Sequence, residues 1–396
     1  MTKRSIRILK SAALVTAVAG LLTGCGSEEP ASGAKPLSES APPIIAAYAS
    51  LVQNSYIEAM DETSSLNATL AQFVADPTEA RLESAREAWL LARDPYGLTE
   101  AFRFYGGPID DDDGPEGRIN AWPMDEAYVD YVDGDPNAGI INDPATYPTI
   151  DETTIAELNE KDGEKNIATG YHAIEFLLWG QDLSADGPGQ RPYTDYLVEM
   201  GTAANQERRG QYLLAAGKLL LQDLGSVSAE WAPETGAYRA SFVALPPEEA
   251  LRRILLGLGS LSGAELAGER IQVAYDTKEQ EDEHSCFSDN THKDLLNNAI
   301  GIQNVYLGRR ASVDLPGIDE LVRERDPALD ARLQEEMQAS IDAIEAIGKP
   351  FDQAILGDDT AAGRQKVKKA IEALRKQTST IIEVATLLGL QLNIEE

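Results

Sequence analysis

Apolar residues recur every three or four positions through most of this chain, which predicts long amphipathic helices. The first such segment runs from Ile45 to about Val74, and the second runs from Thr78 to a stop before Pro95. Further helices are expected at residues 193–225, 247–275, 292–308, 327–347 and 360–391, with short ones at 124–132 and 152–160. No run of five or more residues alternates β-branched with polar side chains, so strands are not expected. The pattern therefore predicts an all-α protein built from two packed helix bundles, with long loops between helices.

The first 24 residues predict an export signal rather than a part of the fold. Four basic residues precede an apolar run from Ala12 to Leu22, which is too short to span a membrane. The run closes with LTGC (22–25), which resembles the lipobox of bacterial lipoproteins, in which the cysteine carries the lipid. We therefore expect a lipid on Cys25 and a flexible tether over residues 25–44. This predicts a lipid-anchored protein of the cell envelope that faces the periplasm, with the outer membrane as the expected site.

The charge of the chain excludes one large class of partners. The 396 residues include 66 Asp and Glu but only 34 Lys and Arg, which gives a formal charge of -32. Such a field repels nucleic acid and attracts cations, so nucleic-acid binding is excluded. A composition change near residues 231–236 predicts a boundary between a first bundle over 45–232 and a second over 233–396.

The most informative stretch is GYHAIEFLLWGQD, residues 170–182. His172 and Glu175 are three positions apart, so on a helix they project from the same face and can converge on one ion. An imidazole with a carboxylate suits iron, zinc or copper. Gly170 leaves room for another backbone or a ligand beside this pair. The alternative interpretation is a histidine whose hydrogen bonds are satisfied within the core.

Two ligands do not make a tight transition-metal site, so further donors are needed. Glu265 and Glu269 are four positions apart on a predicted helix of the second bundle and are the expected additional metal ligands. The alternative for these two residues is an ordinary helix face that forms salt bridges with Arg270.

His284 lies in an acidic insertion over residues 277–291 and His292 directly follows it, so the two histidines flank Cys286. They are a second source of an imidazole ligand, or a second metal site of their own. The alternative interpretation is that they are solvated loop residues.

The stretch at 170–182 is similar to the GxHxxE signature of the imelysin-like family. Four further blocks resemble the branch of this family called iron-regulated protein A, and the likeness extends from about residue 45 to residue 391. These blocks are AWLLARDPYGLTEAFRFYGGPID (88–110), GRINAWPMDEAYVDY (117–131), GSLSGAELAGERI (259–271) and QEDEHSCFSDNTHKDLLNNAIGIQNVYLG (280–308).

The resemblance implies a two-bundle helical fold in which the GxHxxE helix faces a cleft between the bundles. It also implies a cell-envelope role linked to iron uptake, and the family has historically carried a metallopeptidase label. Gly170, His172 and Glu175 match the signature positions. The matching blocks imply that further residues line the cleft: Arg93, Glu100, Arg103, Ser262, Glu265, Glu269 and Arg270.

The function expected from the sequence is binding of iron, or of a small iron complex, in the cleft between the bundles. Zinc or copper is the alternative metal, the membrane is a partner through the lipid on Cys25, and an envelope transporter is an expected recipient. A second hypothesis is a metal-independent adaptor whose cleft takes a peptide, a haem-like ligand or a partner protein. A third is a metallopeptidase, although the usual His-Glu-x-x-His signature is absent and no catalytic residue is assigned.

Overall fold

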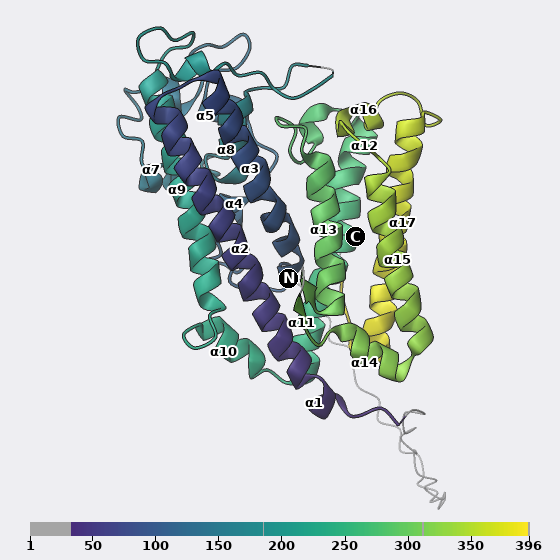
Figure 1. The fold of residues 1–396 in the computed structure, drawn as a ribbon. Helices are drawn as coiled ribbons and strands as arrows, with labels where there is room; N and C mark the ends of the chain where they lie inside the picture. The colour runs from purple at the N-terminus through teal and green to yellow at the C-terminus, as the bar shows by residue number, and fades with distance from the viewer. Residues whose placement is uncertain (1–32, 185, 311–312, 395–396) are drawn as a thin grey trace, which may run out of the picture. The chain divides into compact units, whose positions relative to one another are not determined.

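The regular structure of this protein is helical almost throughout, as a computed structural model of residues 33–184, 186–310 and 313–394 shows (Figure 1). The exception is a short antiparallel pair, β1 (Arg309–Arg310) with β2 (Val313–Asp314). The prediction of an all-α fold is therefore confirmed. The predicted signal peptide and Cys25 lie outside the described residues. The described residues from Lys35 onward form one compact unit.

A first group of helices is built on α2, the longest helix, with α3 and α9 packed along it (Figure 1). Helix α8 packs between α3 and α9, and α10 packs on α2 and α9. The bounds of these helices are α2 (Pro42–Ala75), α3 (Glu79–Thr99), α8 (Gly170–Trp179), α9 (Gln206–Glu230) and α10 (Ala237–Val243).

Three boundaries in this group differ from the sequence-based expectation. Helices α1 (Leu37–Ser40) and α2 occupy residues 37–44, so this part of the predicted tether is helical. Helix α3 continues through Pro95, which is buried together with Tyr96, and packing offsets the hydrogen bond that a proline cannot make. Residues 193–205 hold only the 3₁₀ turn η2 (Tyr193–Tyr196), because the long helix begins at Gln206.

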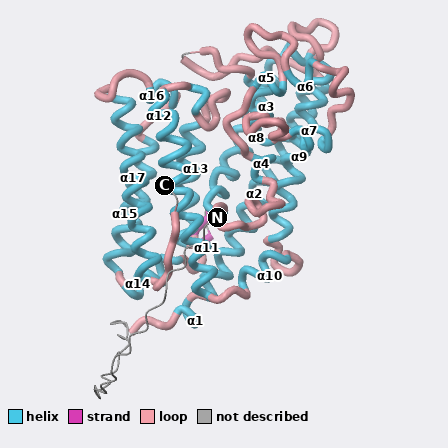
Figure 2. Tube along the Cα trace, turned by 180° about the vertical axis from the view of Figure 1, so that it is seen from behind, coloured by secondary structure: helices cyan, strands magenta, loops and turns pink. Residues whose placement is uncertain are grey.

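A second group of helices contains α13, α15 and α17, which Figure 2 shows side by side from behind. The predicted helix over 247–275 is continuous but not uniform, because its middle part, η3, is a π-helix. Helix α13 packs on α3 and on α15, so it joins the two groups. The bounds are α11 (Pro247–Ser260), η3 (Leu261–Gln272), α12 (Val273–Thr277), α13 (Thr291–Leu307), α14 (Ile318–Arg325), α15 (Pro327–Glu345), α16 (Phe351–Ile355) and α17 (Ala362–Leu387).

Short helical turns interrupt the long loops that connect these helices. They are η1 (Glu100–Phe102), α4 (Glu116–Ile119), α5 (Glu126–Val129), α6 (Gly139–Asn142), α7 (Glu152–Leu158) and η4 (Gln280–Asp282). No helix of the described residues is both long enough and apolar enough to cross a membrane.

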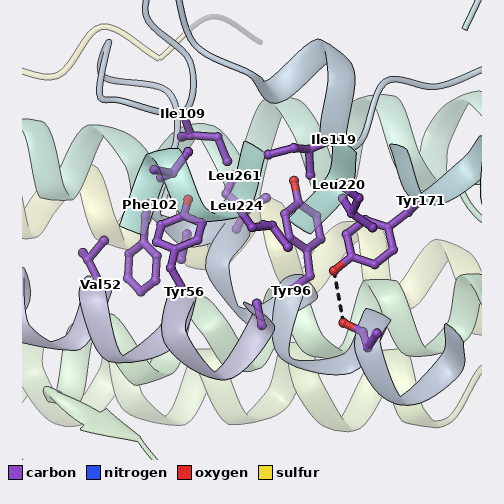
Figure 3. Close-up of a cluster of buried hydrophobic side chains, with 14 of the residues drawn as sticks. Val52, Tyr56, Tyr96, Phe102, Ile109, Ile119, Tyr171, Leu220, Leu224 and Leu261 are labelled. Atoms are coloured by element: carbon purple, nitrogen blue, oxygen red, sulfur yellow. Dashed lines mark hydrogen bonds between the residues drawn. The ribbon is translucent and has the colours of Figure 1, made fainter. Parts of the chain in front are cut away.

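The main hydrophobic core lies between α2, α3, α8 and α9, continues into α11, α13, α14, α15 and α17, and includes several tyrosines (Figure 3). Tyr171 of α8 shares a hydrogen bond of 3.3 Å with the hydroxyl of Thr63, which ties α8 to α2. The hydroxyl oxygens of Tyr56 and Tyr96 are buried and form no hydrogen bond to the described residues. A second apolar cluster lies among η3, α13, α15 and α17. The predicted boundary near residue 232 stays a prediction.

Candidate functional site

The first turn of α8 places the GxHxxE residues, and Gly170 makes that turn possible. The backbone angle φ of Gly170 is +80°, a value that residues other than glycine rarely adopt. A Cβ atom there would lie 2.4 Å from the carbonyl oxygen of Ile119 and 2.7 Å from that of Arg118. The sequence leaves open whether Gly170 makes room for another backbone segment or for a ligand. In the structure, the backbone of Arg118 and Ile119 occupies that place.

His172 and Glu175 contact each other inside the protein, as their spacing predicts. The Nδ1 atom of His172 lies 2.9 Å from Oε2 of Glu175, and the two side chains are 1% and 0% exposed. The other ring nitrogen of His172, Nε2, is buried without a hydrogen-bond partner among the described residues. Glu175 thus fixes the orientation of the imidazole, and Nε2 is the ring nitrogen that is left without a hydrogen-bond partner among the described residues.

The loop before α13 covers this pair. The backbone N–H of Ser288 donates to Oε1 of Glu175 at 2.9 Å, and the Ser288 hydroxyl donates to the same oxygen at 2.6 Å. Next to it, the ring of Phe287 packs against Phe176, and its carbonyl accepts a hydrogen bond from Gly189. The insertion over residues 277–291 is therefore folded onto α8 rather than solvated at this point.

A second imidazole lies beside the first. The rings of His172 and His284 are 4.9 Å apart between centroids and nearly perpendicular. Nδ1 of His284 lies 2.8 Å from Oδ2 of Asp294, so its N–H donates to that carboxylate. Of the two extra histidines considered from the sequence, His284 therefore joins the GxHxxE pair. His292 bonds instead through Nδ1 to the carbonyl of Asp289.

Asp294 also pairs with an arginine from the first group of helices. Arg93 on α3 donates from Nε and Nη2 to the two carboxylate oxygens of Asp294, each at 3.1 Å. A further nitrogen of Arg93 bonds to Asn120, whose amide donates to Glu100 at 3.4 Å. This bidentate pair links α3 to α13 across about 200 positions of sequence.

The network continues from Glu100 to the π-helix. Oε2 of Glu100 accepts from Arg270 at 2.6 Å and from Arg103 at 2.8 Å. Arg270 also contacts Glu265 at 2.8 Å, and Arg103 contacts Glu116 at 3.0 Å. We refer to Arg93, Glu100, Arg103, Arg270 and Asp294 as the paired network.

The π-helical geometry of η3 explains why Glu265 pairs with Arg270. Glu265 and Arg270 are five positions apart, which an α-helix would place about 140° apart around its axis. In a π-helix the i→i+5 hydrogen-bond pattern brings such residues onto one face. The alternative interpretation of Glu265, a salt bridge to Arg270, is the one that the structure shows.

Two predicted site residues lie elsewhere. Glu269 is exposed, so it does not reach His172. Ser262 faces α17, where its hydroxyl contacts the carbonyl of Leu374 and accepts from Gln377 and Thr378. These contacts use the hydroxyl of Ser262 to pack η3 against α17, and its predicted place in a cleft stays a prediction.

The structure does not bring the four predicted metal ligands together. Within residues 33–184, 186–310 and 313–394, no group of three or more His, Cys, Asp or Glu side chains is arranged to hold a metal ion. Cys286 is buried and free. Neither His172 nor His284 lines the pockets of about 420 and 320 Å³ beyond the C-terminal end of α8.

Burial and pairing set the charges around the histidines. Burial would raise the pKa of Glu100 and Asp294, but the arginines beside them hold both pKa values below the usual range. Burial lowers the pKa of His284 to about 4 and that of His172 well below its usual range, so both rings are neutral at pH 7. Burial raises the pKa of Glu175 to about 8, although its hydrogen bonds to Ser288 oppose this. Neutral imidazoles are the form that binds metals.

Comparison with known proteins gives the family. The sequence model of imelysin, which is named as a peptidase family, matches residues 52–381. The chain belongs to the imelysin family. It is 26% identical over 311 residues to iron-regulated protein A of Synechococcus elongatus, covering 76% of this chain and 74% of that protein.

Two solved structures support the fold of this imelysin-family chain. One is a protein from Parabacteroides distasonis assigned as an iron-regulated protein A precursor, with a TM-score of 0.69 and 19% identity over 90% of this chain and 97% of that chain. The other is an imelysin-like protein from Psychrobacter arcticum, with a TM-score of 0.63 and 12% identity over 89% of this chain and 98% of that chain. The resemblance inferred from the sequence is therefore confirmed, and the family supports a role related to iron.

Sequence reasoning missed Asp294, Asn120 and Ser288 in this imelysin-family site. A signal for Asp294 exists, because Asp294 and Asn298 are four positions apart on the buried face of a predicted helix. Buried polar residues at that spacing indicate a hydrogen-bonded network. For Asn120 and Ser288, which lie in loops, the sequence offers no comparable signal.

Proposed function

We propose that this protein binds iron, or a small iron complex, as cargo at His172 and His284. The observation that carries the proposal is the pair of imidazole rings 4.9 Å apart, each with its Nδ1 atom hydrogen-bonded to an acidic side chain. Histidines that bind metals usually donate their second N–H in this way, which fixes the ring and raises the basicity of the ligating nitrogen. The buried, unpartnered Nε2 of His172 is the expected donor atom.

The donor set favours a metal that brings ligands of its own. Two imidazole nitrogens leave coordination positions open, and the described residues offer no third side chain arranged to fill them. Water or the chelating groups of an iron complex would complete the coordination. Zinc and copper also suit imidazole, so the titration below includes zinc as a competitor.

The charge of the chain and its expected location support the same role. A formal charge of -32 raises the concentration of cations near the protein. A lipid on Cys25 would tether the protein to the envelope, where an envelope transporter would receive the cargo. Replacement of Cys25 by serine should move the protein from the membrane fraction to the soluble fraction, and retention in the membrane fraction would contradict the anchor.

The binding site is tested by metal titration of purified, metal-free protein, with elemental analysis after gel filtration. We expect wild type to retain about one iron per chain when supplied with ferrous iron or ferric citrate, and His172→Ala to retain none. His292→Ala is the matched control, because Nε2 of His292 is also unpartnered but no second imidazole packs against its ring.

Three results would contradict the proposal. They are absence of iron from the wild type, equal loss in His172→Ala and His292→Ala, or a tenfold preference for zinc over iron. Circular dichroism of each variant separates loss of binding from loss of fold. Chelator-sensitive cleavage of casein that Glu175→Gln abolishes would instead favour the peptidase hypothesis.

A further inference from the structure

Two pockets meet at the loop that follows α8. The first has a volume of about 420 Å³ and is walled by Tyr131, Trp179 and the loop residues 180–184 and 188–192. The second, of about 320 Å³, lies between residues 278–280 and α16. Asp182, Leu183 and Ser184 line both, so the two are neighbours. We call them the loop pockets, and their sizes fall within the usual range of small-molecule sites.

Asp182 and Asp352 supply carboxylates to the loop pockets, which Arg191 and Lys278 also line. Asp352 is 5% exposed, lines the second pocket, and its Oδ1 atom is buried without a hydrogen-bond partner among the described residues. Asp182 lies between the pockets and accepts hydrogen bonds from the backbone of Ser184 and the side chain of Gln280. Within the described part of the chain, no lysine or arginine forms an ion pair with either carboxylate. Lys278, in the second pocket, donates its Nζ hydrogen to the carbonyl of Gly357.

Two more acids, Glu283 and Asp289, lie close enough to interact electrostatically with Asp182 and Asp352. Burial, followed by repulsion from neighbouring carboxylates, raises the pKa of Asp289 to about 7 and that of Asp182 to about 6. Buried carboxylates that repel one another gain free energy when a cation binds between them. We call Asp182, Glu283, Asp289 and Asp352 the acidic cluster.

The walls of the loop pockets show which kind of cation fits. The described residues offer no three acids close enough to hold a bare metal ion, so the negative charge is spread over a distance. Leu183 is 72% exposed and lines both pockets, and Trp179 and Tyr131 add aromatic surface to the first. Apolar surface between separated carboxylates matches ammonium groups joined by methylene chains.

We propose that the loop pockets bind a linear aliphatic polyamine, with ammonium groups at Asp182 and Asp352 and the methylene chain over Leu183. The site is separate from the histidine pair, so it depends on neither iron nor His172. It adds a second ligand class, an organic polycation, to the proposed metal cargo.

Calorimetric titration of the purified protein with spermidine tests this proposal. The titration is run at pH 8, above the pKa of about 6 of Asp182, and at physiological ionic strength to suppress nonspecific attraction. We expect one spermidine per chain, with affinity about tenfold weaker in Asp352→Asn because a charge-assisted contact is lost. Asp61→Asn is the matched control, since it removes the same charge from an exposed position on α2.

A second variant keeps the proposal testable if Asp352→Asn does not fold. Leu183→Ser changes an exposed side chain and should leave the fold intact, while weakening spermidine binding several-fold through lost methylene contact. Absence of spermidine binding, equal weakening in Asp61→Asn, or displacement of spermidine by an equal concentration of Mg²⁺ would each overturn the proposal. The iron titration of the same samples would be unaffected, so the two proposals can fail separately.

Discussion

The paired network and the acidic cluster both contain buried acids, but the pKa values of these acids shift in opposite directions. In the network, Asp294 and Glu100 each contact arginine side chains, and their pKa values are held low. In the cluster, Asp182 and Glu283 lack such a partner, and burial raises their pKa values. Burial is common to both regions. The comparison shows that a buried acid stays ionised when a basic side chain from a distant part of the sequence lies beside it.

The two regions differ in how the charge of their acids is neutralised, and this difference matters for function. The acids of the paired network are neutralised by its arginines, so the network can hold the histidines in place without any ligand. The acidic cluster is left with negative charge that only protons or a bound cation can neutralise. We therefore expect substitutions in the network to change stability, and substitutions in the cluster to change the response to pH and to cations.

The largest effect is expected from breaking the paired network. Arg93→Met should lower the free energy of unfolding by about 3–5 kcal/mol, because it leaves the buried carboxylate of Asp294 without its partner. Arg332→Met removes an exposed ion pair with Glu383, which water screens, so the free energy of unfolding should stay nearly unchanged. Urea denaturation measures both variants, and equal effects would show that the network contributes no more than a surface pair.

A smaller effect is expected at the start of α8, which carries His172 and leads on to Asp182. Gly170→Ala should destabilise the protein by about 3 kcal/mol, since it combines a strained φ with contact against the backbone of Ile119. Gly134→Ala is the control, because Gly134 also has a φ of +80° but a Cβ atom there meets nothing within 4 Å. It should cost about 1 kcal/mol, so thermal unfolding should separate the two variants.

The smallest effect is expected from the pH response of the acidic cluster. The pKa values of Asp182 and Asp289 in the folded protein, about 6 and about 7, lie above the 3.8 of an unperturbed aspartate. Their contribution to stability is therefore complete below about pH 4 and is lost as the pH rises through 6 to 7. Because both side chains are partly exposed, solvent screening limits the combined loss to about 1 kcal/mol.

Removing these two acids should flatten that pH response. In the double variant Asp182→Asn and Asp289→Asn, the difference in unfolding free energy between pH 5 and pH 8 should be smaller than in wild type by about this amount. Asp61→Asn should leave the difference unchanged. An unaltered pH profile in the double variant would contradict the prediction that Asp182 and Asp289 cause the loss of stability between pH 5 and pH 8.

Most of the fold is predictable from the sequence because long helices leave a local periodic signal. Helices α2, α15 and α17 follow that signal closely. The continuation of α3 through Pro95 could not be predicted, since it depends on how well its neighbours pack. The π-helical turns of η3 leave no local signal either, because the apolar spacing of residues 261–272 also suits an α-helix.

The candidate site was predictable only where its residues are close in sequence. The contact between His172 and Glu175 follows from a spacing of three on a helix. The approach of His284 to His172 depends on how a loop folds over α8, and neither residue's neighbours in sequence indicate it. Pairs such as Arg93 with Asp294 depend on tertiary packing, so the sequence shows two charged residues but not their partnership.

The separation of Arg93 and Asp294 by 201 positions has a consequence for biogenesis. Until α13 packs onto α3, the first helices lack the carboxylate that neutralises this guanidinium. The N-terminal half therefore cannot complete its interior by itself, and final consolidation of the molecule waits for the arrival of α13.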